Sequence, residues 1–406
     1  MINHSPQIGA AGKRGETVRS DCFVEVALKK SGGIKLELES KVGVLYGDSI
    51  QRLVFEMCEH FGLKHANIFL EDKGALPFTI AARFEAALKR ARPELEMEFL
   101  LPIHAKKKLP TTKDRLRRSR LYLPGDEPKF FINAGLHKPD GIILDLEDSV
   151  ALSEKDAARL LVRNALRCID FYGAERMVRL NQNQAGLEDL RYIVPHHVDV
   201  ILIPKCESPQ QVIAVENEVA KLRRQFDVAN EICFLPIIES ALGVIKAYEI
   251  ATASVQNCGL AIGLEDYTAD LGVERTREGE ESRCGRSMIV NAAKAAGLQA
   301  LDSVFSEVND LDGLRASVIE AKSLGFEGKG CIHPRQIQII HAGFAPTPDE
   351  ISKAMRVVSA FEDAQNRGIG VVALDSKMID APVVKRAQKT VELALLYPEK
   401  NVAQSS

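Results

Sequence analysis

The chain has 406 residues, of which 46% are hydrophobic and 27% charged, and its formal net charge at pH 7 is only −3. This length suits two domains, or one large and one small, with a substantial apolar core. The balanced charge argues against a nucleic-acid-binding surface and gives no indication of an anionic membrane as a partner.

The composition also bears on the compartment of the protein. The longest apolar runs fall well short of the roughly 20 residues that a membrane-spanning helix needs, and the N-terminal residues lack the apolar stretch of a secretion signal. The eight cysteines lie too far apart for a zinc knuckle or a redox CxxC motif. We therefore expect a cytoplasmic protein with reduced thiols.

Four regions follow one another along the chain. Residues 1–100 combine alternating apolar runs with two helix-period stretches, which predicts a small α+β domain. Residues 101–116 contain two prolines and a lysine run without helical periodicity, and we expect a linker there. A regular region covers 117–345, and 346–406 are expected to form C-terminal helices around a short extended run.

The regular region contains eight apolar, strand-like runs, each followed by a stretch long enough for a helix. Such runs predict parallel strands whose outer face is covered by helices. Eight of them, with no division into two halves, favour an α/β fold of the (β/α)₈ (TIM) barrel type. The runs are "RLYLPG", "GIILDLED", "RMVRLN", "VDVILIPK", "ICFLPIIES", "GLAIGLED", "LQALDSVF" and "FEGKGCIH".

Charged residues gather where these runs end, and the active site of such a barrel lies at the C-terminal ends of its strands. Glu239 and Asp266 end two runs about one βα repeat apart, so we expect them on adjacent strands. Carboxylates without a nearby His or Cys are hard oxygen ligands that suit Mg²⁺ or Mn²⁺. Arg179, at the end of another run, could hold a substrate carboxylate or an enolate oxygen.

Other interpretations stay open at this point. A single charge after a strand is often only a solvated loop residue, although six of the eight runs end in charge. Lys205 ends "ILIPK" and is either a Schiff-base lysine or a charge partner for neighbouring carboxylates. His333 is expected to be a hydrogen-bonded structural residue.

Eight ordered motifs between residues 117 and 395 resemble the citrate lyase beta-subunit family of the HpcH/HpaI aldolase superfamily, which includes malyl-CoA and citramalyl-CoA lyases. The motifs are "RRSRLYLPGDEPKFFINA", "DGIILDLEDSV", "MVRLN", "ILIPKCES", "PIIESALGV", "IGLEDYTADLG", "GKGCIHPRQI" and "MIDAPVVKRAQ". The resemblance implies a (β/α)₈ barrel with a C-terminal helical lid, assembled as a homotrimer or homohexamer.

The resemblance also implies roles for individual residues. Glu239 and Asp266 would bind Mg²⁺, and Arg179, Arg118 and Glu239 would contact the substrate. Asp380 in "MIDAP" is similar to the catalytic aspartate of the family, which enters the active site of an adjacent subunit.

The first hundred residues resemble a second protein, the acyl carrier (gamma) subunit of citrate lyase. In such carriers a serine in an "ESSD"-like segment bears a prosthetic arm. The corresponding stretch here is "TVRSDC", in which Arg19 stands at the modified position and Ser20 follows it. Either Ser20 takes the arm, or the domain carries none and serves in docking or assembly with other citrate-lyase-like subunits.

Together these features predict a Mg²⁺-dependent lyase acting on a small-molecule 3-hydroxyacyl thioester of the citryl-, malyl- or citramalyl-CoA or carrier-bound type. Retro-Claisen cleavage would release an acetyl thioester and a 2-oxo acid. Arg179 would offset developing negative charge, and Asp380 would return a proton to the enolate carbon. Two alternatives remain: a metal-free aldolase with a Schiff base on Lys205, and a non-catalytic scaffold of a citrate-lyase-like complex.

Overall fold

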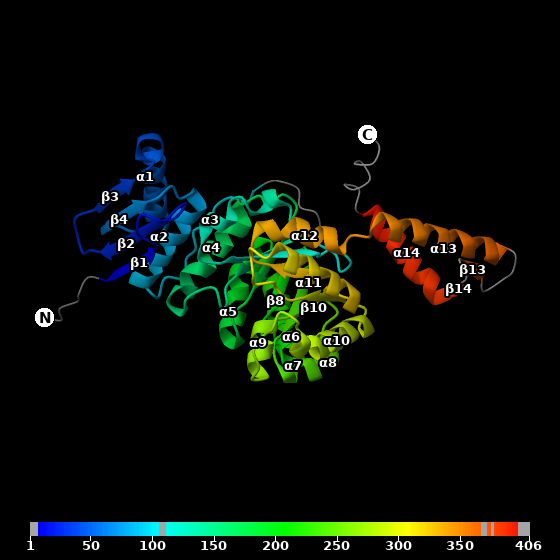
Figure 1. Ribbon diagram of the computed structural model, residues 1–406. Coiled ribbons are helices and arrows are strands. Elements are labelled where there is room, and N and C mark those ends of the chain that lie inside the picture. Colours follow the sequence, from blue (N-terminus) through cyan, green and yellow to red (C-terminus); the bar gives the residue numbers. More distant parts are fainter. Residues whose placement is uncertain (1–6, 105–110, 367–371, 375–376, 397–406) are drawn as a thin grey trace.

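The computed structural model describes residues 7–104, 111–366, 372–374 and 377–396. An N-terminal α/β unit, a barrel and a C-terminal helical hairpin follow one another along the chain (Figure 1). Residues 105–110 of the expected linker lie outside the described part. No helix within these ranges is long and apolar enough to cross a membrane.

The N-terminal unit is a four-stranded sheet of order β1-β2-β4-β3 with two helices. Only β3 and β4 are parallel, and the other neighbours run antiparallel. The alternation in "CFVEVAL" buries every second residue of β2 against the helices, which is the period expected of a strand with one covered face. The elements are β1 (Ile8–Gly12), β2 (Cys22–Leu28), β3 (Ile34–Ser40), α1 (Gly43–His60), β4 (Ala66–Asp72) and α2 (Pro77–Ala91).

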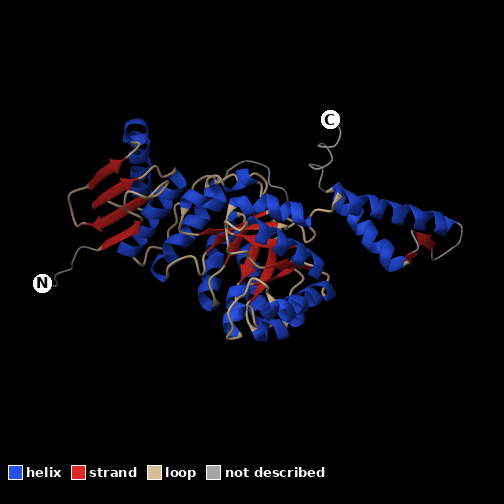
Figure 2. Ribbon diagram, viewed as in Figure 1, coloured by secondary structure: helices blue, strands red, loops and turns tan. Residues whose placement is uncertain are grey.

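The next region is a closed barrel of eight parallel strands surrounded by helices (Figure 2), which confirms the predicted fold class. Each of the eight apolar runs forms one strand. The strands are β5 (Ser119–Pro124), β6 (Gly141–Asp145), β7 (Glu175–Arg179), β8 (Val200–Ile203), β9 (Cys233–Ile238), β10 (Gly259–Ile262), β11 (Gln299–Asp302) and β12 (Gly328–Cys331). The helices are α3 (Pro128–Phe131), α4 (Lys155–Cys168), α5 (Asn183–Ile193), α6 (Pro209–Gln225), α7 (Ala241–Ile245), α8 (Ala247–Ala251), α9 (Leu264–Asp270), α10 (Glu280–Ala295), α11 (Leu311–Leu324) and α12 (Pro334–Phe344).

The barrel strands are buried on both faces, which explains why most of them are runs of apolar residues rather than an alternation of apolar and polar ones. One set of side chains packs outward against the helices, and a second set fills the barrel interior. The interior set comprises Ile143, Met177, Val200, Leu202, Cys233, Leu235, Ile237, Cys258, Ala261 and Leu301, with Tyr122 packed against it. This filled interior leaves the strand ends as the place for a binding site.

Local sequence signals set the helix ends around the barrel. At the start of α6, Ser208 and Gln211 form a capping box, and Pro209 stands between them in the first turn. At α12, the Nδ1 atom of His333 accepts a hydrogen bond from the backbone N–H of Arg335 at 3.1 Å. His333 is therefore the structural, hydrogen-bonded histidine that the sequence predicts.

A buried ion pair and a buried hydrogen bond join the N-terminal unit to the barrel. Helix α2 lies between the N-terminal sheet and α4 of the barrel. At this junction Arg163 of α4 makes two hydrogen bonds to Glu85 of α2, at 3.1 and 2.7 Å, and both side chains are at most 1% exposed. Arg83 of α2 pairs with Asp21 and also donates to the backbone carbonyl of Asp126, at 2.8 Å each. The domain that resembles a carrier is thus fixed on the barrel.

The C-terminal segment forms an antiparallel helical hairpin, α13 (Pro348–Asn366) and α14 (Ala381–Leu395), with the short strands β13 (Val372–Leu374) and β14 (Lys377–Ile379) at its tip. Its own small core includes Ala354, Val357, Ile379, Val384 and Ala387. Figure 1 shows the hairpin projecting from the side of the barrel. The hairpin thus packs mainly on itself.

Candidate active site

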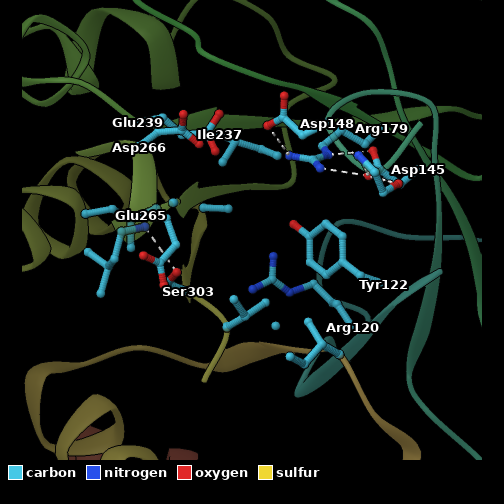
Figure 3. A pocket seen from close by; sticks show the side chains of 18 of the residues that line it. Arg120, Tyr122, Asp145, Asp148, Arg179, Ile237, Glu239, Glu265, Asp266 and Ser303 are labelled. Atoms are coloured by element: carbon cyan, nitrogen blue, oxygen red, sulfur yellow. Dashed lines mark hydrogen bonds and ion pairs between the residues drawn. The ribbon is translucent and has the colours of Figure 1, made fainter. Parts of the chain in front are cut away.

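A cavity of about 410 Å³ opens where the barrel strands end. All the strands except β8 contribute a lining residue or lead directly into one. Figure 3 shows two carboxylates, Glu239 and Asp266, together at one edge of the cavity, and Arg179 with Asp145 at the other. The cavity thus combines an acidic edge and a cationic group above an apolar barrel core.

Glu239 follows β9 directly and is only 6% exposed. Its Oε2 accepts a hydrogen bond of 2.8 Å from the backbone N–H of Lys205, a residue with a left-handed backbone (φ 45°). Burial raises the pKa of Glu239 to about 7, and the hydrogen bond from Lys205 offsets only part of that effect. The carboxylate is therefore held in a fixed orientation in a place that favours a compensating positive charge.

Gly263 allows the acidic edge to form. A side-chain methyl group at Gly263 would collide with the side chain of Glu239, so a larger residue there would displace the carboxylate. Helix α9 begins directly after Gly263 and places Asp266 in its first turn, beside Glu239. Asp266, in the acidic stretch that follows β10, thus forms a carboxylate pair with Glu239.

The pair fits a hard divalent cation such as Mg²⁺. The ammonium group of Lys205 lies 3.2 Å from Oδ1 of Asp266, so positive charge is already drawn to this edge. Among the described residues, no group of three or more His, Cys, Asp or Glu side chains could hold a metal alone. Two protein carboxylates would leave the other positions to water and substrate oxygens, which is the arrangement that Mg²⁺ favours.

Arg179 is held rigidly at the end of β7. Its Nε and Nη2 atoms donate to the two oxygens of Asp145 at 2.7 and 2.8 Å, and Nη1 lies 2.7 Å from Oε2 of Glu147. Burial works against the charge, but hydrogen bonding and attraction from Asp145 outweigh it and raise the pKa of Arg179 above its ordinary value. Arg179 is a permanent, preorganised cation at the cavity wall.

Comparison with known proteins shows to which family the chain belongs. The family model HpcH/HpaI aldolase/citrate lyase matches residues 118–334. The citrate lyase subunit beta of Haemophilus influenzae is 42% identical over 283 residues, which cover 69% of this chain and 97% of that protein. The chain belongs to the HpcH/HpaI aldolase/citrate lyase family. A second model, an acyl carrier model described as malonate decarboxylase delta subunit, matches residues 12–91.

Other members of the HpcH/HpaI family are also similar. The mitochondrial citramalyl-CoA lyase of Rattus norvegicus is 32% identical over 333 residues, covering 79% of this chain and 98% of that protein. Among solved structures, CitE of Mycobacterium tuberculosis in complex with magnesium, acetoacetate and coenzyme A has a TM-score of 0.58. It is 31% identical, and the match covers 70% of this chain and 99% of CitE.

The structure brings three of the predicted site residues together: Glu239, Asp266 and Arg179 all line the cavity. Arg118 does not line this cavity, and its contact with substrate stays a prediction. It precedes β5 at the opposite, N-terminal end of the barrel, and its Nε and Nη2 atoms each donate to Asp140 at 2.7 Å. Its side chain therefore lies away from the cavity in this structure.

Asp380 and Ser20 lie outside the cavity of their own chain. Asp380 begins α14, and its carboxylate accepts a hydrogen bond of 3.2 Å from the backbone N–H of Val383 on the projecting hairpin. Ser20 is half-buried in the N-terminal unit, has a left-handed backbone (φ 56°) and donates its backbone N–H to the carbonyl of Lys73. Both assignments stay predictions.

The sequence analysis assigned no role to Asp145 and Arg120, which line the cavity, or to Glu147, which contacts Arg179 at the cavity wall. Asp145 and Glu147 were recognisable as charges at a strand end, but their function is to clamp Arg179. Arg120 lies within a run that is otherwise apolar, "RLYLP", and lines the cavity below Tyr122 (Figure 3). A charged residue inside a strand that is buried on both faces was the signal available for it.

The raised pKa of Glu239 predicts how the metal-free protein responds to pH. Its carboxyl has an ordinary pKa of 4.5 and a pKa of about 7 in the folded chain. Between these values the folded state binds a proton that the unfolded state has released, so the free energy of unfolding falls as pH rises from 4.5 to 7. The contribution is on the order of 3 kcal/mol.

Urea denaturation in EDTA at pH 5 and pH 8, on wild type and on Glu239→Gln, measures this contribution. We expect the wild type to lose more stability between the two pH values than the variant, because the amide does not titrate. Parallel loss in both proteins would mean that Glu239 titrates normally.

Proposed function

We propose that this protein is a Mg²⁺-dependent lyase that cleaves a 3-hydroxyacyl thioester, of the CoA type, into an acetyl thioester and a 2-oxo acid. The observation that carries the proposal is the pair Glu239 and Asp266, adjacent at the cavity edge and facing the clamped Arg179. Family membership supports the lyase class, because the similar proteins include citrate lyase subunit beta and citramalyl-CoA lyase.

Glu239 and Asp266 would hold the cation. When bound, Mg²⁺ supplies Lewis-acid polarisation of the substrate oxygens at the carbon that carries the hydroxyl group. The hydrogen bond from Lys205 keeps Glu239 oriented for this task, and the neighbouring ammonium group offsets part of the acidic charge around Asp266.

Arg179 would stabilise negative charge on the substrate, and Asp380 would transfer a proton. The hydroxyl proton leaves to solvent, the carbon–carbon bond breaks, and its electron pair passes to the thioester enolate. Arg179 stabilises negative charge on the substrate carboxylate or the enolate oxygen, because its guanidinium is fixed before the substrate arrives. Asp380 donates a proton to the enolate carbon, which becomes the methyl group of the acetyl thioester.

Asp380 performs this role in a neighbouring copy of the chain. It stands at the start of α14 on a hairpin that projects from its own barrel (Figure 1). A homotrimer or homohexamer in which each hairpin reaches the next cavity would complete every site and shield the enolate from water.

Complementation between two inactive variants tests this arrangement. Asp380→Asn is expected to lower kcat by about 10²- to 10⁴-fold while Mg²⁺ affinity stays nearly unchanged, because the carboxylate pair is intact. Mixing it with Glu239→Gln, after subunit exchange, should restore about a quarter of the sites, since each restored site needs one intact group from each of two neighbours. Lack of restoration in demonstrably mixed oligomers would place Asp380 in its own chain's site or outside the mechanism.

A panel of citryl-CoA, malyl-CoA and citramalyl-CoA, assayed with Mg²⁺ and with EDTA, tests the proposed function itself. We expect cleavage of at least one thioester with Mg²⁺ and loss of cleavage in EDTA. Activity that survives EDTA, together with a substrate adduct that borohydride traps on Lys205, would favour a Schiff-base aldolase. The structure opposes that alternative: although burial works against the charge, attraction from Glu147 and Asp148 raises the pKa of Lys205, whereas a nucleophilic amine needs a lowered one.

We infer that the N-terminal domain is a fixed docking module rather than a swinging carrier. Its buried contacts to the barrel, Glu85 with Arg163 and Arg83 with the Asp126 carbonyl, hold it in one position. The opposite expectation is a prosthetic arm on Ser20, which would have to reach its site from this fixed position. Its partners would be other subunits of a citrate-lyase-like assembly.

A further inference from the structure

Arg120 differs from the other large buried arginines of the chain. Among the residues that the structure describes, four arginines are at most 1% exposed, and three of them pair with a carboxylate: Arg83 with Asp21, Arg117 with Glu175 and Arg163 with Glu85. Arg120 instead donates from Nη2 to the backbone carbonyl of Asp302 at 2.8 Å. Among the described residues, its Nε and Nη1 atoms have no hydrogen-bond partner.

Two unsatisfied donors on a buried cation need an explanation. Buried polar groups are almost always hydrogen-bonded, and an unpaired charged donor is destabilising. Burial lowers the pKa of Arg120 below its ordinary value, whereas Asp21 outweighs burial and raises the pKa of Arg83. The carboxylate of Asp302 attracts Arg120 but is paired with Arg286 and Lys329, and no carboxylate of the described residues forms an ion pair with Arg120.

The position of Arg120 indicates where an anionic partner would come from. Arg120 and Tyr122 are two residues apart on β5, and successive residues of a strand alternate in direction, so both project into the barrel interior. Both line the cavity, and Figure 3 shows the guanidinium below the Tyr122 ring, directed toward the middle of the cavity. Arg120 thus forms the floor of the candidate active site.

The other cation of the cavity is already engaged. Two cationic side chains line it, Arg179 and Arg120. Arg179 has its Nε, Nη1 and Nη2 atoms directed at Asp145 and Glu147. Arg120 is therefore the cavity cation with donors to spare, and these donors suit the two oxygens of a carboxylate.

We propose that Arg120 is a specificity-determining residue that binds a second carboxylate, on the 2-oxo-acid half of the substrate. This inference rests on the proposed function and adds the substrate class to it. The three candidate thioesters differ in one substituent on the carbon that bears the hydroxyl group: carboxymethyl in citryl-CoA, methyl in citramalyl-CoA and hydrogen in malyl-CoA. Of these, the carboxymethyl group alone satisfies Arg120.

The physical reason for discrimination is the cost of leaving Arg120 unpaired. A site built to hydrogen-bond a substrate group rejects analogues that lack it, because the buried donors then stay unsatisfied. A carboxylate placed on the cavity floor forms charge-assisted hydrogen bonds with Nε and Nη1. We therefore expect the wild type to favour citryl-CoA over citramalyl-CoA and malyl-CoA.

Arg120→Met tests the proposal, because it keeps an unbranched apolar chain of similar length and removes the charge and the donors. We expect the ratio of kcat/KM for citryl-CoA to kcat/KM for citramalyl-CoA to fall roughly 10- to 100-fold. Arg120→Lys should retain part of the preference for citryl-CoA. Arg315→Met, on the exposed face of α11, is the matched control and should leave the ratio unchanged. Melting temperatures establish that each variant is folded.

Calorimetry with Mg²⁺ and the 2-oxo-acid products gives a readout that is independent of turnover. Wild type should bind oxaloacetate more tightly than pyruvate, and Arg120→Met should reduce this preference by a similar factor. A variant that weakens both ligands equally, or neither, would overturn the specificity role and leave the lyase assignment standing. If the wild type cleaves none of the three thioesters, the proposed function fails, and the ratio of oxaloacetate to pyruvate affinity still decides the role of Arg120.

Discussion

Glu239→Gln is expected to remove both Mg²⁺ binding and thioester cleavage. The amide keeps the shape of the side chain but cannot supply the negative charge that a hard divalent cation requires. Because a bound metal ion contributes several kcal/mol of charge stabilisation at the reacting oxygens, kcat/KM should fall by about 10³-fold or more. Mg²⁺ titration by calorimetry and a thioester cleavage assay measure the two effects separately.

Glu249→Gln is a suitable control for this experiment. Glu249 is an exposed residue of α8, outside the cavity, and its substitution removes the same charge from the protein. It should leave metal affinity and turnover unchanged. If Glu239→Gln instead retained wild-type Mg²⁺ affinity, the metal would lie elsewhere and the carboxylate pair would lose its assigned role.

Arg163→Met is expected to lower the free energy of unfolding by about 3–5 kcal/mol, which is the usual effect of breaking a buried ion pair. The substitution leaves the carboxylate of Glu85, which is at most 1% exposed, without its main partner at the junction of α2 and α4. The N-terminal unit should also loosen from the barrel. Urea denaturation followed by circular dichroism, together with limited proteolysis between the two units, measures both effects.

Two further variants separate charge from packing at this junction. Arg163→Met combined with Glu85→Met should recover much of the lost stability, because no unpaired buried charge remains. Arg283→Met removes an exposed pair with Glu280 and should change stability by less than about 1 kcal/mol. Equal effects of Arg163→Met and Arg283→Met would show that the N-terminal unit is not fixed by the buried pair.

The outline of the fold follows from local patterns. Each of the eight barrel strands is a short apolar run flanked by helix-length segments, and such runs specify buried parallel strands without reference to their neighbours. The convergence of Glu239, Asp266 and Arg179 follows as well, because the C-terminal ends of all barrel strands meet at one mouth. The proposed role of Asp380 could not be reached this way, since it rests on similarity to a family and would require contact with a second subunit.

Pairings between distant segments decided the rest. Arg118 and Arg120 stand two positions apart in one motif, yet Arg118 pairs with Asp140 at the far end of the barrel, while Arg120 lies inside it below the cavity. The burial that raises the pKa of Glu239 and the pairing of Glu85 with Arg163 likewise arise only when separate elements pack together. Periodicity in the sequence indicates which face of an element is covered, but the segment that covers it comes from elsewhere in the chain. That segment determines whether a charged side chain is neutralised, has its pKa shifted or stays available for a ligand.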